Sequence, residues 1–99
     1  MQLLTKAQKA KMIKNYKNQD GTKEFKAVVK LFNPTGQGSW YLSELNPDTN
    51  VAFGLCKISD EEFGYVDLNE LTSFKGQMGL SIERDRWFIP TNFSDLKLA

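Results

Sequence analysis

The chain has 99 residues, of which 40% are hydrophobic and 25% charged, so it is typical of one small globular domain and leaves no room for a second independent core. It contains one cysteine and no histidine, which excludes an internal disulfide, a Ser/His/Asp triad, a Cys/His dyad and every zinc-finger spacing. We therefore expect a single domain over residues 1–99, located in the cytoplasm, with no signal peptide, membrane span, metal or cofactor.

The net charge of +1 hides an uneven distribution along the chain. Residues 1–30 carry eight lysines and two acids, a balance of +6, whereas residues 31–99 carry five basic and ten acidic side chains, a balance of −5. A basic N-terminal third could bind nucleic acid. The candidate surface would comprise Lys6, Lys14, Lys17, Lys23, Lys26 and Lys30. Lysine-rich helices and edge strands are also common as solvated surfaces, so both interpretations stay open.

A helix is predicted near the N-terminus. Thr5 and Gln8 have the spacing of a capping box, and the helix would follow over residues 6–16. Its packing face would consist of Met12, Ile13 and Tyr16. The turn residues at 18–21 then end it.

Four apolar segments separated by turn residues predict strands at 25–32, 39–45, 51–56 and 63–66. In the third segment, Val51, Phe53 and Leu55 alternate with smaller residues. We therefore expect this strand in the interior of a sheet, with Phe53 and Leu55 buried. The turn before the fourth strand is predicted at the acidic residues 59–62.

A second, short helix is predicted from Asp67, because Asp67 and Glu70 repeat the capping-box spacing. Its apolar side would carry Leu68, Leu71 and Phe74, and Gly76 would end it. Residues 80–89 form a further strand-like segment. Hairpin-length loops connect the strands, so the predicted class is α+β: a mostly antiparallel sheet of four or five strands, with the N-terminal helix and the second short helix packed on it.

The charged run Glu83-Arg84-Asp85-Arg86 contains two carboxylates, which Glu44 could join in space. Such a group could act as an acid/base pair or hold a divalent cation, because hard ions prefer carboxylate oxygens. In a strand, however, Glu83 and Asp85 share one face and the two arginines the other, which equally describes a structural ladder of ion pairs. Both interpretations stay open, and no catalytic or metal-binding residue is assigned.

Aromatic residues offer a second candidate site. Trp40, Tyr41, Tyr65 and Trp87 could form a stacking platform for single-stranded nucleic acid, although a small domain also needs such rings in its core. Cys56 has apolar neighbours and no histidine to activate it, so we expect a small buried residue with an unreactive thiol. The candidate interaction or ligand surface comprises Trp40, Glu44, Tyr65, Glu83, Arg84, Asp85 and Trp87.

Short segments spread over nearly the whole chain carry a resemblance to a known family. They are Leu3-Leu4-Thr5-Lys6, Val28-Val29-Lys30-Leu31-Phe32, Trp40, Ser43-Glu44, Phe53-Gly54-Leu55, Gly64-Tyr65-Val66, Glu70-Leu71, Gly79-Leu80 and Ile82-Glu83-Arg84-Asp85. Through these segments the chain resembles an uncharacterised bacterial domain-of-unknown-function family, number 2958. The resemblance implies a setting on conjugative plasmids and related mobile elements. It supplies no activity and no catalytic residues.

Three functional classes follow. The first expectation is a non-enzymatic protein-interaction or accessory module of a bacterial mobile genetic element, which could engage or counter a host factor; its partner would be another protein. The alternative is a nucleic-acid-binding protein that uses the lysine-rich N-terminal third, with weak binding at physiological salt. The third is a small enzyme or ligand-binding domain that uses Glu44, Glu83 and Asp85.

Overall fold

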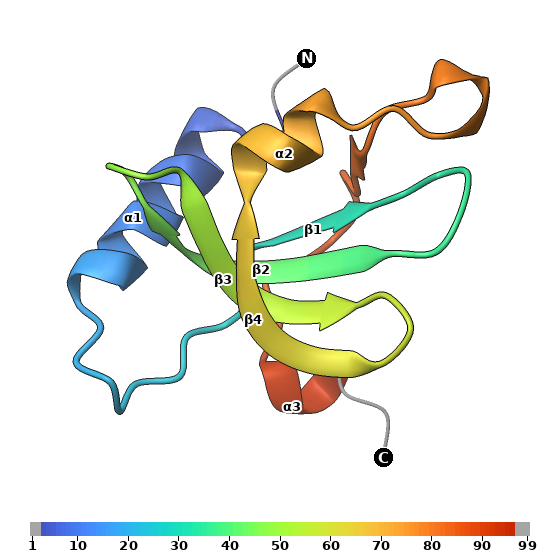
Figure 1. Ribbon diagram of the computed structural model, residues 1–99. Helices are drawn as coiled ribbons and strands as arrows, with labels where there is room; N and C mark the ends of the chain where they lie inside the picture. The colour runs from blue at the N-terminus through green and yellow to red at the C-terminus, as the bar shows by residue number, and fades with distance from the viewer. Residues whose placement is uncertain (1–2, 97–99) are drawn as a thin grey trace.

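The computed structural model describes residues 3–96. Residues 1 and 2, which belong to the N-terminal segment where no signal peptide is expected, and Lys97, one of the basic residues of the C-terminal part, lie outside the described residues. The strands are β1 (Val29–Phe32), β2 (Ser39–Asn46), β3 (Val51–Lys57), β4 (Glu61–Asp67) and β5 (Glu83–Arg84). The helices are α1 (Lys6–Lys17), α2 (Leu68–Ser73) and α3 (Phe93–Leu96), with a 3-10 turn at Gln77–Gly79 (Figure 1). All strand pairs are antiparallel and form one five-stranded sheet in the order β4-β3-β2-β1-β5, which confirms the predicted α+β class.

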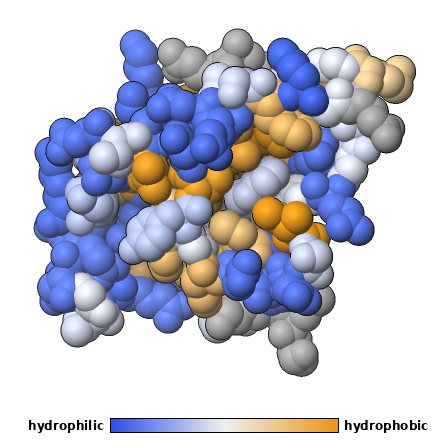
Figure 2. Space-filling model, in the orientation of Figure 1, coloured by the Kyte–Doolittle hydropathy of each residue, from blue (hydrophilic) through white to orange (hydrophobic). Residues whose placement is uncertain are grey.

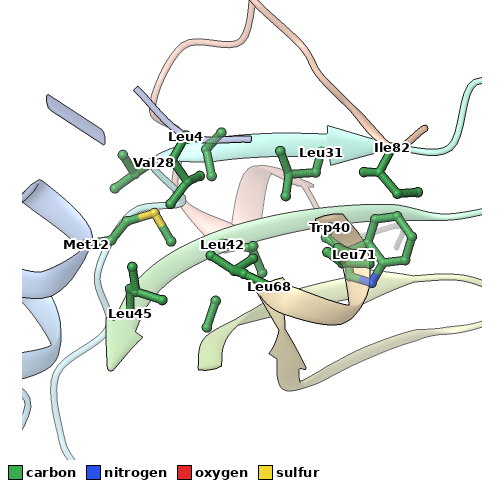
Figure 3. Packing of buried hydrophobic residues seen from close by; sticks show 12 residues of the cluster. Leu4, Met12, Val28, Leu31, Trp40, Leu42, Leu45, Leu68, Leu71 and Ile82 are labelled. Carbon is green, nitrogen blue, oxygen red and sulfur yellow. The ribbon is translucent and has the colours of Figure 1, made fainter. Parts of the chain in front are cut away.

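One face of the sheet, the helix-covered face, packs against both α1 and α2 (Figure 3). The buried residues of this main core are Leu4, Met12, Val28, Val29, Leu31, Trp40, Leu42, Leu45, Ala52, Leu68, Leu71 and Ile82. Their side chains come from both helices and from three of the strands, so burial of this apolar surface is the dominant force that holds the layers together.

The start of α1 confirms the predicted capping box. The Thr5 hydroxyl accepts a hydrogen bond from the Gln8 amide at 3.0 Å, and the Gln8 side chain accepts one from the Thr5 amide at 2.9 Å. The predicted packing face is wrong in one position, because Tyr16 is exposed and Asn15 is buried in its place. The burial of Asn15 is compensated by a hydrogen bond to β2.

Several predicted boundaries need correction. The first strand starts at Val29 and not at residue 25, because Ala27 pairs with Thr91 of the C-terminal segment through hydrogen bonds of 2.9 and 3.1 Å. The acidic turn is shorter than predicted, since β4 already begins at Glu61. In the 80–89 segment only two residues are strand, because the Asp85 side chain accepts the Trp87 amide and turns the chain.

The second short helix begins as predicted, with Asp67 as its N-cap: the Asp67 carboxylate accepts a hydrogen bond from the Asn69 amide at 2.8 Å. The helix ends earlier than predicted. Its C-cap is Phe74, so the helix stops before Gly76, the residue predicted to end it. The Phe74 side chain is 40% exposed and adds little to the main core.

The third strand lies in the sheet interior as predicted, but its larger side chains face away from α1 and α2. Ala52 belongs to the main core, whereas Leu55 is buried on the opposite face with Ala27 and Phe93 of α3. We call this opposite side of the sheet the open face. Leu55 is fully buried as predicted, but Phe53 is only partly buried because α3 does not extend over it.

A bulge in β2 decides which side chains reach the open face. The register places Leu42 opposite Gly54 and then Glu44 opposite Phe53, so Ser43 is an extra residue in β2. Without it, Glu44 would lie opposite Ala52 on the helix-covered face, since a shift of one residue exchanges the two faces of a strand. The bulge therefore places the carboxylate of Glu44 on the open face and returns Leu45 to the main core.

Two features hold this bulge. The buried Asn15 side chain of α1 donates a hydrogen bond to the Ser43 carbonyl oxygen at 2.9 Å. Gly54 of β3 provides the space, because a Cβ atom there would lie 2.7 Å from the Cα of Leu42 and still closer to the backbone of Tyr41. No larger residue fits at position 54 without moving the backbone of β2.

We predict that Gly54→Ala lowers the free energy of unfolding by about 3 kcal/mol or more, because the new methyl group overlaps the backbone of the neighbouring strand. Its cross-strand partner provides a matched control. Gly64→Ala meets no atom within 4 Å and should change stability by less than about 1 kcal/mol. Urea unfolding of the two variants checks this, and equal stabilities would contradict the packing at the bulge.

Candidate functional site

The open face is only partly covered. The C-terminal segment packs over Leu55 and Tyr41 through Phe88, Phe93 and Leu96. Beside it lies a hollow of about 360 Å³ between the sheet and the loop that follows α1. Figure 2, seen from the side of β4, shows apolar side chains near the middle of the molecule among hydrophilic ones. The hollow on the open face is itself lined mainly by aromatic side chains of the sheet and α3 and by polar residues of the loop.

Aromatic rings line this hollow, which we call the aromatic groove; its walls carry Phe25, Phe53, Phe63, Tyr65 and Phe93. Phe53 lies opposite Tyr65 in the sheet, with ring centroids 5.1 Å apart. Phe63 stacks on Phe53 at 6.0 Å and meets Phe93 edge-on at 5.0 Å. Tyr65 nevertheless exposes 78% of its surface, so the end of this ring row remains open to a ligand.

Glu44 also lines the groove and is only 8% exposed. Its Oε2 atom accepts a hydrogen bond from the Gln19 side-chain amide at 3.1 Å. Among the described residues no hydrogen bond reaches Oε1 of Glu44, and no ion pair joins it to a lysine or arginine. Burial raises the pKa of the Glu44 carboxyl above its ordinary value, and the hydrogen bond from Gln19 opposes this shift.

Gln19 is fixed by its own loop. Its Nε2 atom also donates to the Lys23 carbonyl oxygen at 2.8 Å, while its Oε1 accepts the amides of Gly21 and Lys23 at 3.0 and 3.1 Å. These bonds hold residues 19–23 as a compact turn beside the sheet. From the sequence, this segment was predicted only as the turn that ends a helix, and Gln19, Phe53 and Phe63 were not predicted as groove residues. The spacing of Phe63 and Tyr65 on an acidic strand was the signal that could have indicated them.

The predicted interaction surface is not one surface. Trp40 is a core residue on the helix-covered face, which corrects its assignment as a surface residue. Trp87 is 89% exposed, but it follows β5, at the sheet edge opposite β4 where Tyr65 lies. Of the four aromatic side chains proposed as a stacking platform, only Tyr41 and Tyr65 share the open face. Trp40 is in the main core and Trp87 lies at the far edge, so the four do not form one platform.

The three carboxylates considered for a ligand site are also separated. Glu83 and Asp85 line a hollow with Trp87, whereas Glu44 lies in the aromatic groove. Within residues 3–96, no group of three or more cysteine, aspartate or glutamate side chains could hold a metal ion. Asp85 pairs with Lys30 at 3.9 Å, and Arg84 donates to the Leu3 carbonyl oxygen at 3.1 Å, so two members of the charged run make structural contacts.

The candidate lysine surface is divided as well. The lysines of α1 are exposed, as are Lys23 and Lys26. Lys30, in contrast, is half-buried on the open face, where its ammonium group pairs with Asp85 and lies 5.5 Å from the centre of the Tyr41 ring. Lys57 approaches the same ring at 5.3 Å. Lys30 is therefore engaged within the fold.

Cys56 packs against the main core but is only partly buried, which corrects the prediction of a buried residue. Burial raises the pKa of its thiol, and the negative charge of Glu62, directly opposite on β4, raises it further. The thiol is thus held in its protonated, poorly nucleophilic form.

The fold is a small α+β domain with an aromatic groove on one face of an antiparallel sheet. The chain belongs to the DUF2958 family, described as a protein of unknown function, whose family model matches residues 3–95. This confirms the predicted family, while its setting on mobile elements stays a prediction. No curated protein and no solved structure matches the chain. In the part of the chain that the structure describes, no helix has the length and apolar character needed to cross a bilayer.

We predict slow labelling of Cys56 by a thiol reagent at neutral pH, because its raised pKa keeps the thiolate scarce. Labelling should become fast when denaturant is added. The variant Glu62→Gln should label faster than the wild type in the native state, because it removes a charge that disfavours the thiolate. Fast labelling of the native wild type would contradict this environment.

The raised pKa of Glu44 also predicts a pH-dependent stability. The folded protein binds this proton more tightly than the unfolded chain, so the contribution of Glu44 to the free energy of unfolding falls as pH rises from the unfolded pKa through the folded one. The variant Glu44→Gln has no carboxyl group at this position, so this fall in the free energy of unfolding with rising pH is absent. The stability of the variant relative to wild type should therefore be more favourable at about pH 7 than at about pH 4 in urea unfolding. A difference that is independent of pH would show that Glu44 is not desolvated.

Proposed function

We propose that this protein is a non-enzymatic protein-interaction module that binds its partner through the aromatic groove. In line with the family resemblance, we propose further that it serves as an accessory protein of a bacterial mobile element and engages or counters a host factor in the cytoplasm. The observation that carries the proposal is the exposure of Tyr65 beside Phe53 and Phe63, on a sheet face that α3 leaves uncovered.

Exposed rings of this kind favour a protein partner. Aromatic residues are enriched in the buried centres of protein interfaces, where they supply much of the binding energy. The rings also lie next to an edge, since β4 is the last strand of the sheet and its outer side has no neighbouring strand among the described residues. A partner could therefore contact the groove and the edge strand at once.

The nucleic-acid alternative has one observation in its favour, which is the exposure of the lysines on α1. The groove favours a protein partner, because the carboxylate of Glu44 lines it and would repel a phosphate. The enzyme alternative has less support, because Glu44 does not share a hollow with Glu83 or Asp85.

Affinity purification from the native host, with and without nuclease, tests the proposal. We expect capture of a host or element-encoded protein that Tyr65→Ala weakens by about tenfold or more, and that nuclease leaves unchanged. The control is Trp87→Ala, which removes a largely exposed ring outside the groove and should retain capture. Both variants should fold, because both side chains are largely exposed.

Two results would contradict the proposal. The first is equal capture by the wild type and Tyr65→Ala. The second is capture that nuclease abolishes, that falls steeply with salt and that the double variant Lys14→Glu/Lys17→Glu removes, which would favour the nucleic-acid alternative.

A further inference from the structure

The aromatic groove holds a negative charge that the described residues leave without a cation. Glu44 is 8% exposed, and one of its two oxygens accepts only a neutral hydrogen bond, from Gln19. The side chain is largely covered, but Oε1 reaches the groove surface, since no fully buried side-chain oxygen of the described residues lacks a hydrogen bond. A carboxylate that has lost part of its hydration is stabilised when a cation pairs with it. A positively charged group in hydrogen-bond contact with Oε1 would therefore stabilise the groove.

The neighbouring row of side chains on the same face shows what such a pairing looks like in this fold. There the Tyr41 ring has the ammonium groups of Lys30 and Lys57 at 5.5 and 5.3 Å from its centre. Lys30 in turn pairs with Asp85, and Lys57 with Glu61 at 3.8 Å. Aromatic ring, cation and carboxylate thus occur together within the chain.

The next row contains the ring and the carboxylate but no such cation. Glu44, Phe53 and Tyr65 face one another across β2, β3 and β4. Lys17 and Lys23 line the edges of the hollows around Glu44, but neither forms an ion pair with it. We infer that the groove binds an arginine side chain of the partner protein, with the guanidinium group over Phe53 and Tyr65 and hydrogen-bonded to Oε1 of Glu44.

Arginine fits this site better than lysine. Its guanidinium group is planar and weakly hydrated, so it stacks on aromatic faces and gives up its water at a lower cost than an ammonium group. One oxygen of Glu44 is already used by Gln19, so either cation would make one hydrogen bond to Oε1, and the preference for arginine rests on its stacking and weaker hydration. The exposed Tyr65 ring lies where the stem of an entering side chain would pass.

The inference rests on the proposed function, but a small probe tests it separately. Nα-acetyl-arginine methylamide is titrated against the labelled protein by NMR, beside the lysine analogue and the neutral citrulline analogue. We expect saturable, millimolar binding of the arginine probe, with shifts at Glu44, Phe53 and Tyr65. The citrulline analogue, which has nearly the same shape without the charge, should bind about tenfold more weakly.

Variants assign the binding to Glu44. Glu44→Gln should weaken the arginine probe about tenfold, whereas the charge-matched control Glu70→Gln, an exposed residue of α2 on the other side of the sheet, should bind like the wild type. The double variant Lys17→Gln/Lys23→Gln should bind equally well or more tightly. If the probe bound only to this double variant, the groove would be neutralised by its own lysines and the inference would be wrong.

The pH dependence gives a further readout. The other titratable groups around Glu44 are Tyr16 and Lys17 of α1, Lys23 and Glu24 of the following loop, and Tyr65 of β4. Arginine binding should weaken as Glu44 becomes protonated and should lower the pKa of its carboxyl. Glu44→Gln should abolish this dependence.

The remaining outcomes separate the two proposals. Equal binding of arginine and citrulline probes, tighter binding of the lysine probe, or tighter binding of guanosine monophosphate would overturn the arginine site. Capture of a partner that depends on Tyr65 but not on Glu44 would do the same and leave the protein-interaction proposal intact. Binding of the arginine probe without any Tyr65-dependent partner would contradict the proposed function and retain the cation site.

Discussion

The hydrogen bond from the Asn15 side chain to the carbonyl oxygen of Ser43 connects α1 to the β2 bulge, and both ends of it are buried. A buried amide without a partner would cost about 1–3 kcal/mol, so the helix can dock only where this carbonyl turns towards it. The bulge in turn requires Gly54, because any side chain there would overlap the backbone of β2. The extra residue of β2, Ser43, is therefore held in place by two elements: α1 through Asn15, and β3 through the space that Gly54 leaves.

The consequence of the bulge is electrostatic as much as geometric. It exchanges the faces of the residues that follow it, so that Leu45 completes the main core and Glu44 lies among the rings of the open face. An uninterrupted β2 would direct a carboxylate towards α1 and α2, where it would disrupt the apolar core. The same irregularity that protects the core thus produces a partly desolvated negative charge on the surface proposed for binding, where aromatic rings strengthen the attraction for a cation.

Local patterns in the sequence predicted the helix starts and the strand centres well. The capping box at Thr5, the N-cap at Asp67 and the interior strand predicted at 51–56 were confirmed, because hydrogen-bonding side chains and period-two alternation act over a few residues. The groove could not be predicted in the same way. The alternation placed Phe53 on one face of its strand but did not indicate which face the helices cover. The bulge at Ser43 depends on Asn15, which lies 28 residues away from it in the sequence.

The register of β2 against β3 tests this account most directly, and it can be measured from the backbone cross-strand contacts in NMR spectra of the wild-type protein. We expect Leu42 opposite Gly54, Glu44 opposite Phe53 and Leu45 opposite Ala52, with Ser43 unpaired in the ladder. An uninterrupted register, with Ser43 opposite Phe53 and Glu44 opposite Ala52, would contradict the account, because it would remove Glu44 from the groove.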